Sequence, residues 1–403
     1  MEWIMIVFWL CAVLVVYHHV GYPLLLKFGG RQARKVANPP RPLDRGFKTD
    51  ATDEALPTIT LLMPVYNEAA TIAAKLQNLA SLDYPADKLW VHVHFDGCSD
   101  NSYPIALSQL GDPALQQLQI RLFDHPRNRG KVAVLNEAMT RVHSDLVALT
   151  DVSALLPIDS LLLAVAHFAD PKVGVVGEAY RFWQPGSQGE ESYWHYQSQI
   201  KLCESALGGM LGAHGAFYMM RRECLTPLAA DTINDDFILP MQAIAKGYRA
   251  VYDNRCAALE LEVSDAALEA TRRKRIGAGN TQQLLRLLPL LHPKFGWVAF
   301  NFASGKGLRV LMPLCLTLLW LCAIPLATQY LLFQLLLGLQ LLGYLLVILI
   351  QLTPVHPWPN LFRKIHYLVL GHWYNGMGTL RYCLRAPIRL ALSQLRVERL
   401  ILK

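Results

Sequence analysis

The chain has 403 residues, of which 53% are hydrophobic and 17% are charged, and its mean hydropathy is +0.24. This composition is too apolar for a soluble enzyme of this size, so part of the chain is expected to lie in lipid. The formal net charge of +7 fits an anionic membrane surface or an anionic substrate. No nucleic-acid motif accompanies this charge, so nucleic acid is not expected as a partner. The eight cysteines are scattered and indicate neither a zinc site nor a disulfide framework.

The first segment, 1–27, is almost wholly apolar and long enough to cross the hydrocarbon core of a membrane. We expect an uncleaved transmembrane anchor. The alternative is a signal peptide. However, the N-terminus carries the acidic Glu2 in place of a positively charged n-region, and no small-residue cleavage site follows. Residues 28–56 form a basic, proline-rich linker, so the positive-inside rule places the next domain in the cytoplasm. The sequence thus predicts a multi-pass protein of the plasma (inner) membrane with a cytoplasmic domain.

Residues 57–280 have the pattern of an α/β domain. The predicted strands are 59–63, 90–95, 120–123 and a run from 146 that ends in one acid, and the predicted helices are 69–82 and one that follows the basic loop 125–131. Repetition of strand, loop and helix predicts a mostly parallel sheet with right-handed crossovers. Nearly all polar motifs fall in the loops after the strands, where ligands bind in such sheets.

The chain becomes apolar again toward its C-terminus. We predict interfacial helices over 281–307 and two transmembrane helices over 308–352. The last segment, 353–403, holds a third hydrophobic stretch and a basic tail. If that stretch, 365–384, crossed the membrane, the basic tail would lie outside, against the charge rule. An interfacial or re-entrant helix is therefore preferred, with a spanning helix as the alternative.

Asp151 ends the short apolar run 146–150. An acid delivered by a buried strand to the open edge of a sheet can meet both a metal ion and a phosphate. On its own the same acid could equally cap the following helix.

Three other loops carry groups that suit a nucleotide. The segment 64–68, with Pro64, Tyr66 and Glu68, offers a flat peptide surface and an acid where a nucleoside could sit. The segment 96–102 begins with Asp96 and would also make a good turn and helix cap. Lys131, beside a glycine at a helix start, places a cation and free N–H groups where a pyrophosphate could bind. A capped helix start for the first loop, and a solvated basic turn for the last, remain as alternatives.

Three later segments add acids, small residues and cations. Asp235 and Asp236 precede an apolar helical run, where they could act as a base or could simply lie at the helix N-terminus. His214 and Gly215 lie in a small-residue stretch, and His214 either touches a ligand or is a satisfied loop histidine. The basic segment 272–275 precedes a predicted glycine-rich turn. Its cations could hold a pyrophosphate or face anionic lipid.

The ordered set of these segments, over about 59–279, resembles the family 2 glycosyltransferases, which are membrane-associated inverting enzymes with a GT-A fold. The resemblance implies a GT-A (nucleotide-diphospho-sugar transferase) domain flanked by transmembrane helices. It also implies an enzyme that transfers a hexosyl or N-acetylhexosaminyl group from a nucleotide diphosphate sugar, expected to be a UDP-sugar. The expected acceptor is a lipid-linked sugar or a glycan in envelope or exopolysaccharide biosynthesis. Membrane lipids and other polysaccharide-assembly proteins are further expected partners.

The resemblance also implies roles for residues. Asp236 is the base and Asp235 replaces the family's glutamate; Asp151 binds Mg²⁺ or Mn²⁺; His214 and Gly215 lie at the acceptor. The residues implied in nucleotide-sugar binding are Pro64, Tyr66, Glu68, Asp96, which would contact uracil, Lys131, Asp151, Arg272 and Arg275.

The sequence departs from the family pattern at two positions. Ser153 stands where a second acid is common, which puts the second metal ligand in doubt. Ile276 stands where the processive synthases carry tryptophan, which argues against extrusion of a long polymer without excluding it. A processive polysaccharide synthase is therefore one alternative. A catalytically silent membrane scaffold or nucleotide sensor is the alternative from another class.

Overall fold

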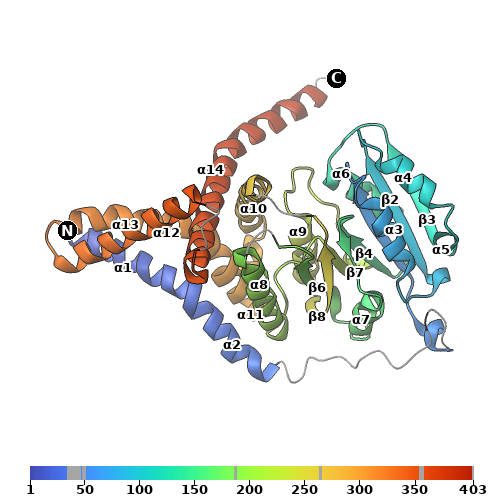
Figure 1. Cartoon of the computed structure of the whole chain (residues 1–403), viewed down its shortest axis with the longest axis horizontal. Helices are drawn as coiled ribbons and strands as arrows, with labels where there is room; N and C mark the ends of the chain where they lie inside the picture. The colour runs from blue at the N-terminus through green and yellow to red at the C-terminus, as the bar shows by residue number, and fades with distance from the viewer. Residues whose placement is uncertain (34–46, 48–50, 186–187, 263–265, 354–357, 402–403) are drawn as a thin grey trace.

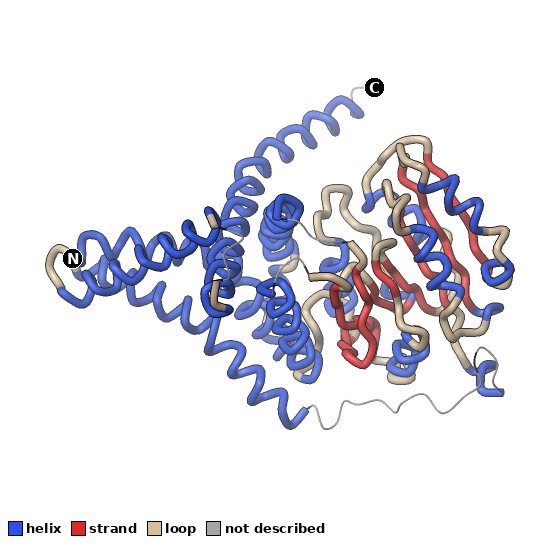
Figure 2. Tube along the Cα trace, viewed as in Figure 1, coloured by secondary structure: helices blue, strands red, loops and turns tan. Residues whose placement is uncertain are grey.

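The computed structural model describes residues 1–33, 47, 51–185, 188–262, 266–353 and 358–401. Figure 1 shows an α/β domain at one end of the molecule and long helices at the other, with α8 (Gln188–Ala206) and α10 (Ala266–Arg286) between them. The strands gather in a single sheet (Figure 2). The predicted linker residues from 34 to 46 and from 48 to 50 lie outside the described residues.

The sheet has eight strands in the order β3-β2-β1-β4-β7-β6-β8-β5. Their bounds are β1 Ile59–Val65, β2 Leu89–Asp96, β3 Gln119–His125, β4 Leu146–Thr150, β5 Ala154–Leu155, β6 Val173–Phe182, β7 Phe217–Arg221 and β8 Arg249–Glu260. Strands β3, β2, β1 and β4 are parallel to one another, and β6 is parallel to β8. Strand β7 is antiparallel to both β4 and β6, and β5 is antiparallel to β8. The mostly parallel sheet is thus confirmed, with β7 and β5 as reversed strands.

Strands β1, β2 and β4 are buried on both faces of the sheet, which explains their continuous apolar runs. Along β1, Leu61 and Met63 face one core together with α3 (Ile72–Ala80), and Leu62 faces a second core with α6 (Lys131–Thr140). The other helices of the domain are α4 Ser102–Gln109, α5 Pro113–Gln116, α7 Ser160–His167 and α9 Asp235–Ala245.

Two predicted boundaries at β1 differ from the structure. Pro64 and Val65, expected in a loop, still pair with β2. The next helix, expected from residue 69, begins at Ile72. The backbone N–H groups of Glu68 and Ala69 donate instead to the side chains of Ser102 and Asp100. Because these side chains satisfy the backbone before the helix, residues 68–71 form a turn.

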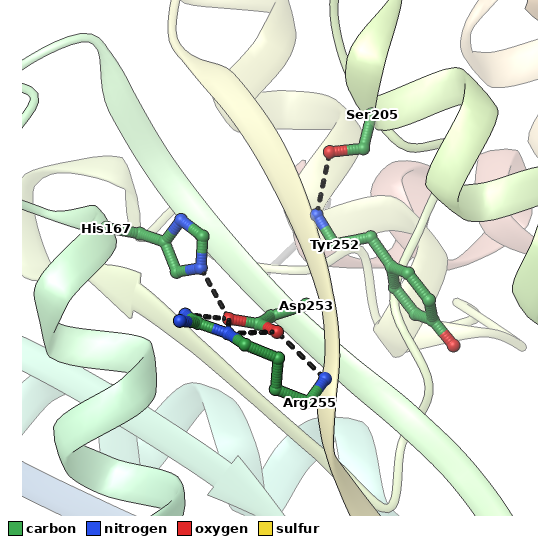
Figure 3. A network of polar contacts seen from close by, with 5 residues as sticks. All are labelled: His167, Ser205, Tyr252, Asp253 and Arg255. Carbon is green, nitrogen blue, oxygen red and sulfur yellow. Dashed lines mark hydrogen bonds and ion pairs between the residues drawn. The ribbon is translucent and has the colours of Figure 1, made fainter. Parts of the chain in front are cut away.

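Strand β8 is fixed to the helices on both sides by polar contacts (Figure 3). The Asp253 carboxylate lies 2.8 Å from Nε2 of His167 on α7 and accepts from Nε of Arg255 at 2.9 Å. Burial raises the pKa of Asp253, but these hydrogen bonds outweigh burial and hold it well below its ordinary value. The N–H of Tyr252 donates to Ser205 Oγ at 2.9 Å. Helix α8 is therefore held in a fixed position against the sheet.

The glycines at 277 and 279 do not form the predicted turn, because both lie inside α10. A Cβ on Gly277 would lie 2.8 Å from Asn375 Cα, and one on Gly279 would lie 2.2 Å from Asn234 Nδ2. These glycines therefore permit close packing of α10 against its neighbours rather than a bend in the chain.

Among the described residues, three helices are long and apolar enough to cross a membrane: Glu2–Gly30, Trp297–Ala327 and Leu331–Leu352. The first consists of α1 (Glu2–Val16), a π-helical segment (Tyr17–Gly21) and most of α2 (Tyr22–Ala33). The second joins α11 (Trp297–Asn301), a π-helical segment (Phe302–Gly307) and α12 (Leu308–Ala327). The third is α13 (Leu331–Leu352), as predicted.

The helices over 281–307 differ from the prediction at both ends of this range. Residues 281–286 complete α10, and residues 297–307 belong to the same helix as α12. The polar residues between 301 and 306 lower the local hydropathy, which concealed this continuity in the sequence. The third hydrophobic stretch lies in one continuous helix, α14 (Asn360–Ile401), which packs along α10 and is not one of the three candidate spans.

Candidate active site

A cavity of about 730 Å³ lies among the sheet, α8, α10, α14 and the first two candidate spans. Many of the predicted site residues line it, although they come from distant parts of the chain. They are Lys131, Asp151, His214, Gly215, Asp235, Asp236, Arg272 and Arg275. The predicted nucleotide loops, with Pro64, Tyr66, Glu68 and Asp96, are not part of this lining.

Lys131 lies between two of the cavity's acids. It begins α6, and its Nζ is 2.9 Å from Asp151 Oδ1 and 3.5 Å from Asp235 Oδ2. Burial lowers the pKa of Lys131, but Asp151 and Asp235 outweigh burial and raise it. Burial raises the pKa of Asp151, whereas Lys131 outweighs this and lowers it. Lys131 is therefore a fixed cation, and Asp151 a fixed anion, at the carboxyl end of β4.

Asp236 lies in the first turn of α9 and has a different environment. Burial, followed by repulsion from Asp235, raises the pKa of Asp236 to about 6. The helix N-terminus favours an ionised acid, but here burial and the like charge have the larger effect. A carboxylate with a pKa near neutrality is suited to accept a proton from a substrate.

Gly215 separates Asp236 from Asp151. A Cβ at this position would lie 2.9 Å from Asp151 Oδ2 and 3.7 Å from Asp236 Oδ2. The missing side chain therefore leaves a space that both carboxylates border. That space is where a reacting group could contact the two acids at once.

The predicted nucleotide loops meet at the carboxyl ends of β1 to β3. Both carboxylate oxygens of Asp96 accept backbone N–H groups, from Arg129 and Gly130, each at 2.8 Å. Asn67, whose φ is 56°, accepts the Ser99 N–H at 2.8 Å. Asp96 thus fixes the loop that leads into α6 and to Lys131. Its contact with a nucleobase stays a prediction, as do the roles of Pro64, Tyr66 and Glu68.

Gly97 permits this junction, since its φ is +63° and a Cβ would lie 2.2 Å from Asn128 N. We expect Gly97→Ala to displace the 127–130 loop, to add strain of about 1–2 kcal/mol and to weaken nucleoside diphosphate binding. Calorimetric titration would measure the weaker nucleoside diphosphate binding, and the melting temperature would measure the added strain. Gly111→Ala is the control, because Gly111 is exposed and its Cβ would meet only a carbonyl oxygen at 3.6 Å. Unchanged affinity and melting temperature in Gly97→Ala would contradict this assignment.

Aromatic side chains form one wall of the cavity near His214. The His214 ring centroid is 5.8 Å from that of Tyr180 and 5.3 Å from that of Trp194. The Arg272 guanidinium lies over the same two aromatic rings, at 6.0 and 5.9 Å. Among the described residues His214 Nε2 has no hydrogen-bond partner, and burial with nearby cations lowers its pKa. Contact of His214 with a ligand stays a prediction, with a loop histidine as the alternative.

Several lining residues were not predicted from the sequence. On α8 these are Tyr193, Trp194, Lys201 and Glu204, and on the second candidate span they are Lys306 and Arg309. The α8 residues belong to no recognisable motif. Lys306 and Arg309 did carry a signal, because cations within an apolar, membrane-length helix are rare and usually functional.

The acids of the cavity fit a divalent cation only in part. Asp151 Oδ1 contacts Lys131, whereas Oδ2 borders the open space at Gly215. In the part of the chain that the structure describes, no three His, Cys, Asp or Glu residues form a group able to hold a metal. One carboxylate together with phosphate oxygens is nevertheless a common arrangement for Mg²⁺.

Comparison with known proteins agrees with this geometry. The profile of glycosyl transferase family 2 matches residues 60–226, and that of glycosyl transferase family group 2 matches residues 146–368, more than half of the chain. A beta-monoglucosyldiacylglycerol synthase of Synechocystis is 30% identical over 48% of this chain and 41% of its own length. A poly-beta-1,6-N-acetyl-D-glucosamine synthase of Staphylococcus aureus is 26% identical over 51% of this chain and 50% of its own. The chain thus spans half or less of these relatives.

A solved structure extends the likeness to the helices. The mannosyltransferase PcManGT of Pyrobaculum calidifontis, in complex with GDP-Man and Mn²⁺, aligns with a TM-score of 0.66 and 23% identity. The alignment covers 92% of this chain and 98% of the mannosyltransferase. The shared architecture therefore includes the candidate spans as well as the GT-A domain. The family profiles, of which that of family group 2 covers more than half of the chain, show that the chain belongs to the family 2 glycosyl transferases.

Proposed function

We propose that the protein transfers a sugar, with inversion, from a nucleotide diphosphate sugar to an acceptor hydroxyl. The observation that carries this proposal is the pair of acids on either side of Gly215, of which Asp236 has a pKa of about 6. The names of the two synthase relatives support it, and PcManGT has a nucleotide sugar bound.

The proposed reaction is a direct displacement. Asp236 takes the proton of the acceptor hydroxyl, whose oxygen attacks the anomeric carbon from the face opposite the diphosphate. The bond from that carbon to the diphosphate oxygen breaks, and the electron pair leaves with the nucleoside diphosphate. Lys131 and Arg275, which line the same cavity, stabilise the added negative charge. Asp235 shares Lys131 with Asp151 and contributes to the raised pKa of Asp236.

We further propose that Asp151 holds Mg²⁺ or Mn²⁺ together with the donor diphosphate, as the Mn²⁺ in PcManGT suggests. Such a cation, when bound, would offset charge on the leaving group. Ser153 is buried and adds no carboxylate, so the donor itself would supply the other oxygen ligands.

The acceptor is proposed to be lipid-linked, because the cavity reaches the first two candidate spans. The proposed location is the cytoplasmic face of the plasma membrane, in envelope or exopolysaccharide assembly. A processive synthase would use the same acids and remains the second candidate. A silent scaffold is less well supported, because the acids at 151, 235 and 236 all lie in one cavity.

The test is a donor screen with the detergent-purified protein, using UDP- and GDP-sugars with Mg²⁺, Mn²⁺ or EDTA. We expect one donor to release its nucleoside diphosphate with metal, and EDTA to abolish release until metal is restored. The uracil assignment of Asp96 predicts that this donor is a UDP-sugar, so selective turnover of a GDP-sugar would contradict that assignment alone. Nucleotide binding without turnover of any donor, with membrane lipids present, would favour the silent scaffold.

A further inference from the structure

Lys306 and Arg309 place two basic side chains at the membrane end of the cavity. They lie three residues apart on the second candidate span, so their side chains share one side of the helix. Both line the same cavity as Asp236. Lys306 Nζ lies 4.8 Å from the ring centroid of Phe237, the residue after Asp236. This end of the cavity is therefore continuous with the proposed catalytic acid.

Glu204 is the carboxylate that acts electrostatically on both Lys306 and Arg309. Among the described residues no ion pair is formed by Lys306 or Arg309, and the Arg309 guanidinium contacts Tyr193 Oη at 3.5 Å. The acid of this region, Glu204, already accepts from Tyr22 Oη at 3.0 Å and from Leu211 N at 3.1 Å. Lys201, Lys306 and Arg309 thus surround the single carboxylate of Glu204. This excess of basic groups is costly to bury unless a ligand supplies further negative charge.

The surrounding helices are shaped around this end of the cavity. Two π-helical segments, Tyr17–Gly21 and Phe302–Gly307, lie side by side, with His18 Nδ1 at 3.0 Å from the carbonyl oxygen of Ser304. Across the cavity lining, His19 Nε2 lies 2.9 Å from His372 Nε2 of α14. Such π-helical turns within helices are frequent at functional sites. Three separate membrane-proximal elements thus contribute polar groups to one place.

We propose that Lys306 and Arg309 bind the phosphate of an anionic lipid acceptor, whose hydroxyl reaches Asp236. The inference rests on the proposed function and names the acceptor class. The proposed donor site has a separate cation, Lys131, which contacts Asp151. A lipid occupant is favoured over a soluble phosphate, because both cations lie in a helix apolar enough to span the bilayer. A neutral diacylglycerol acceptor would supply no negative charge to these basic groups beyond that of Glu204.

The test compares binding of dioctanoyl phosphatidic acid, dioctanoylglycerol and inorganic phosphate to the detergent-purified full chain, by native mass spectrometry. Lys306→Met and Arg309→Met are each expected to weaken phosphatidic acid binding by about 10–100-fold, as expected for loss of a charged hydrogen bond of about 1.5–3 kcal/mol. Lys306→Arg should retain binding. Lys294→Met is the control, because Lys294 is exposed and precedes the same span. Melting temperatures identify any variant that fails to fold.

Three outcomes would overturn the proposal. Equal binding of dioctanoylglycerol would remove the need for an anion, and equal binding of inorganic phosphate would remove the lipid. Loss of nucleoside diphosphate affinity in Lys306→Met and Arg309→Met would show that these residues bind the donor and not the lipid. Donor hydrolysis without lipid is measured separately. If donor hydrolysis were absent while lipid binding still required Lys306 and Arg309, the result would contradict the catalytic proposal and not this lipid site.

Discussion

Replacing Asp236 with asparagine is expected to lower sugar transfer by about 10²–10⁴-fold, the usual contribution of a general base. The amide has nearly the same shape but cannot accept the acceptor proton. Nucleoside diphosphate affinity should change little, because Lys131 and Asp151 are left in place. Product formation in single turnovers would measure the rate of sugar transfer, and a binding titration would measure the nucleoside diphosphate affinity. Asp231→Asn is the matched control, because Asp231 lies in the same segment but is exposed and pairs with Arg286.

The pH dependence gives an independent readout of the same residue. Because only the ionised form of Asp236 acts as a base, the wild-type rate should rise with pH through about 6 and then level off. The folded pKa is raised, so Asp236 favours folding most at low pH, and this contribution is lost as pH rises through about 6. The asparagine variant should therefore melt no lower than wild type at neutral pH. Wild-type turnover in the variant, or an unchanged acidic limb, would refute the role of Asp236.

The sequence was sufficient to predict the first half of the sheet. Strands β1, β2 and β4 are buried on both faces, so each reads as an apolar run followed by a polar loop. Their parallel pairing brings those loops to one edge, which is why Asp151 and Lys131 could be placed together. The reversal of β7 could not be predicted in this way. It depends on pairing of 217–221 with 146–150, and the sequence between them does not specify that register.

The membrane end of the cavity could not be assembled from sequence. His19 and His372 meet although they are 353 residues apart, and neither lies in a motif. The glycines of α10 show a second limit, because a glycine needed for a turn and one needed for close helix packing look alike. Gly277 and Gly279 were therefore assigned to a turn, although both lie in a helix.

Gly215→Ala is expected to lower transfer by about 10²-fold, the effect of displacing a reacting group by about 1 Å. The added methyl group would lie 2.9 Å from Asp151 Oδ2, closer than a Cβ normally approaches an oxygen, and 3.7 Å from Asp236 Oδ2. It would fill the space that both acids border and shift Asp151 toward Lys131. The backbone need not change, because φ at Gly215 is outside the left-handed region. Single-turnover rates and melting temperatures would measure the two effects separately.

Gly111→Ala is the matched control for Gly215→Ala. Both substitutions add one methyl group at a glycine outside the left-handed region, but only Gly215 faces the acids. A slow Gly215→Ala with an unchanged melting temperature would place the reaction between Asp151 and Asp236. If transfer continued at the wild-type rate, the reacting sugar would have to lie elsewhere in the cavity. Asp236 would then be too far from the acceptor to act as its base.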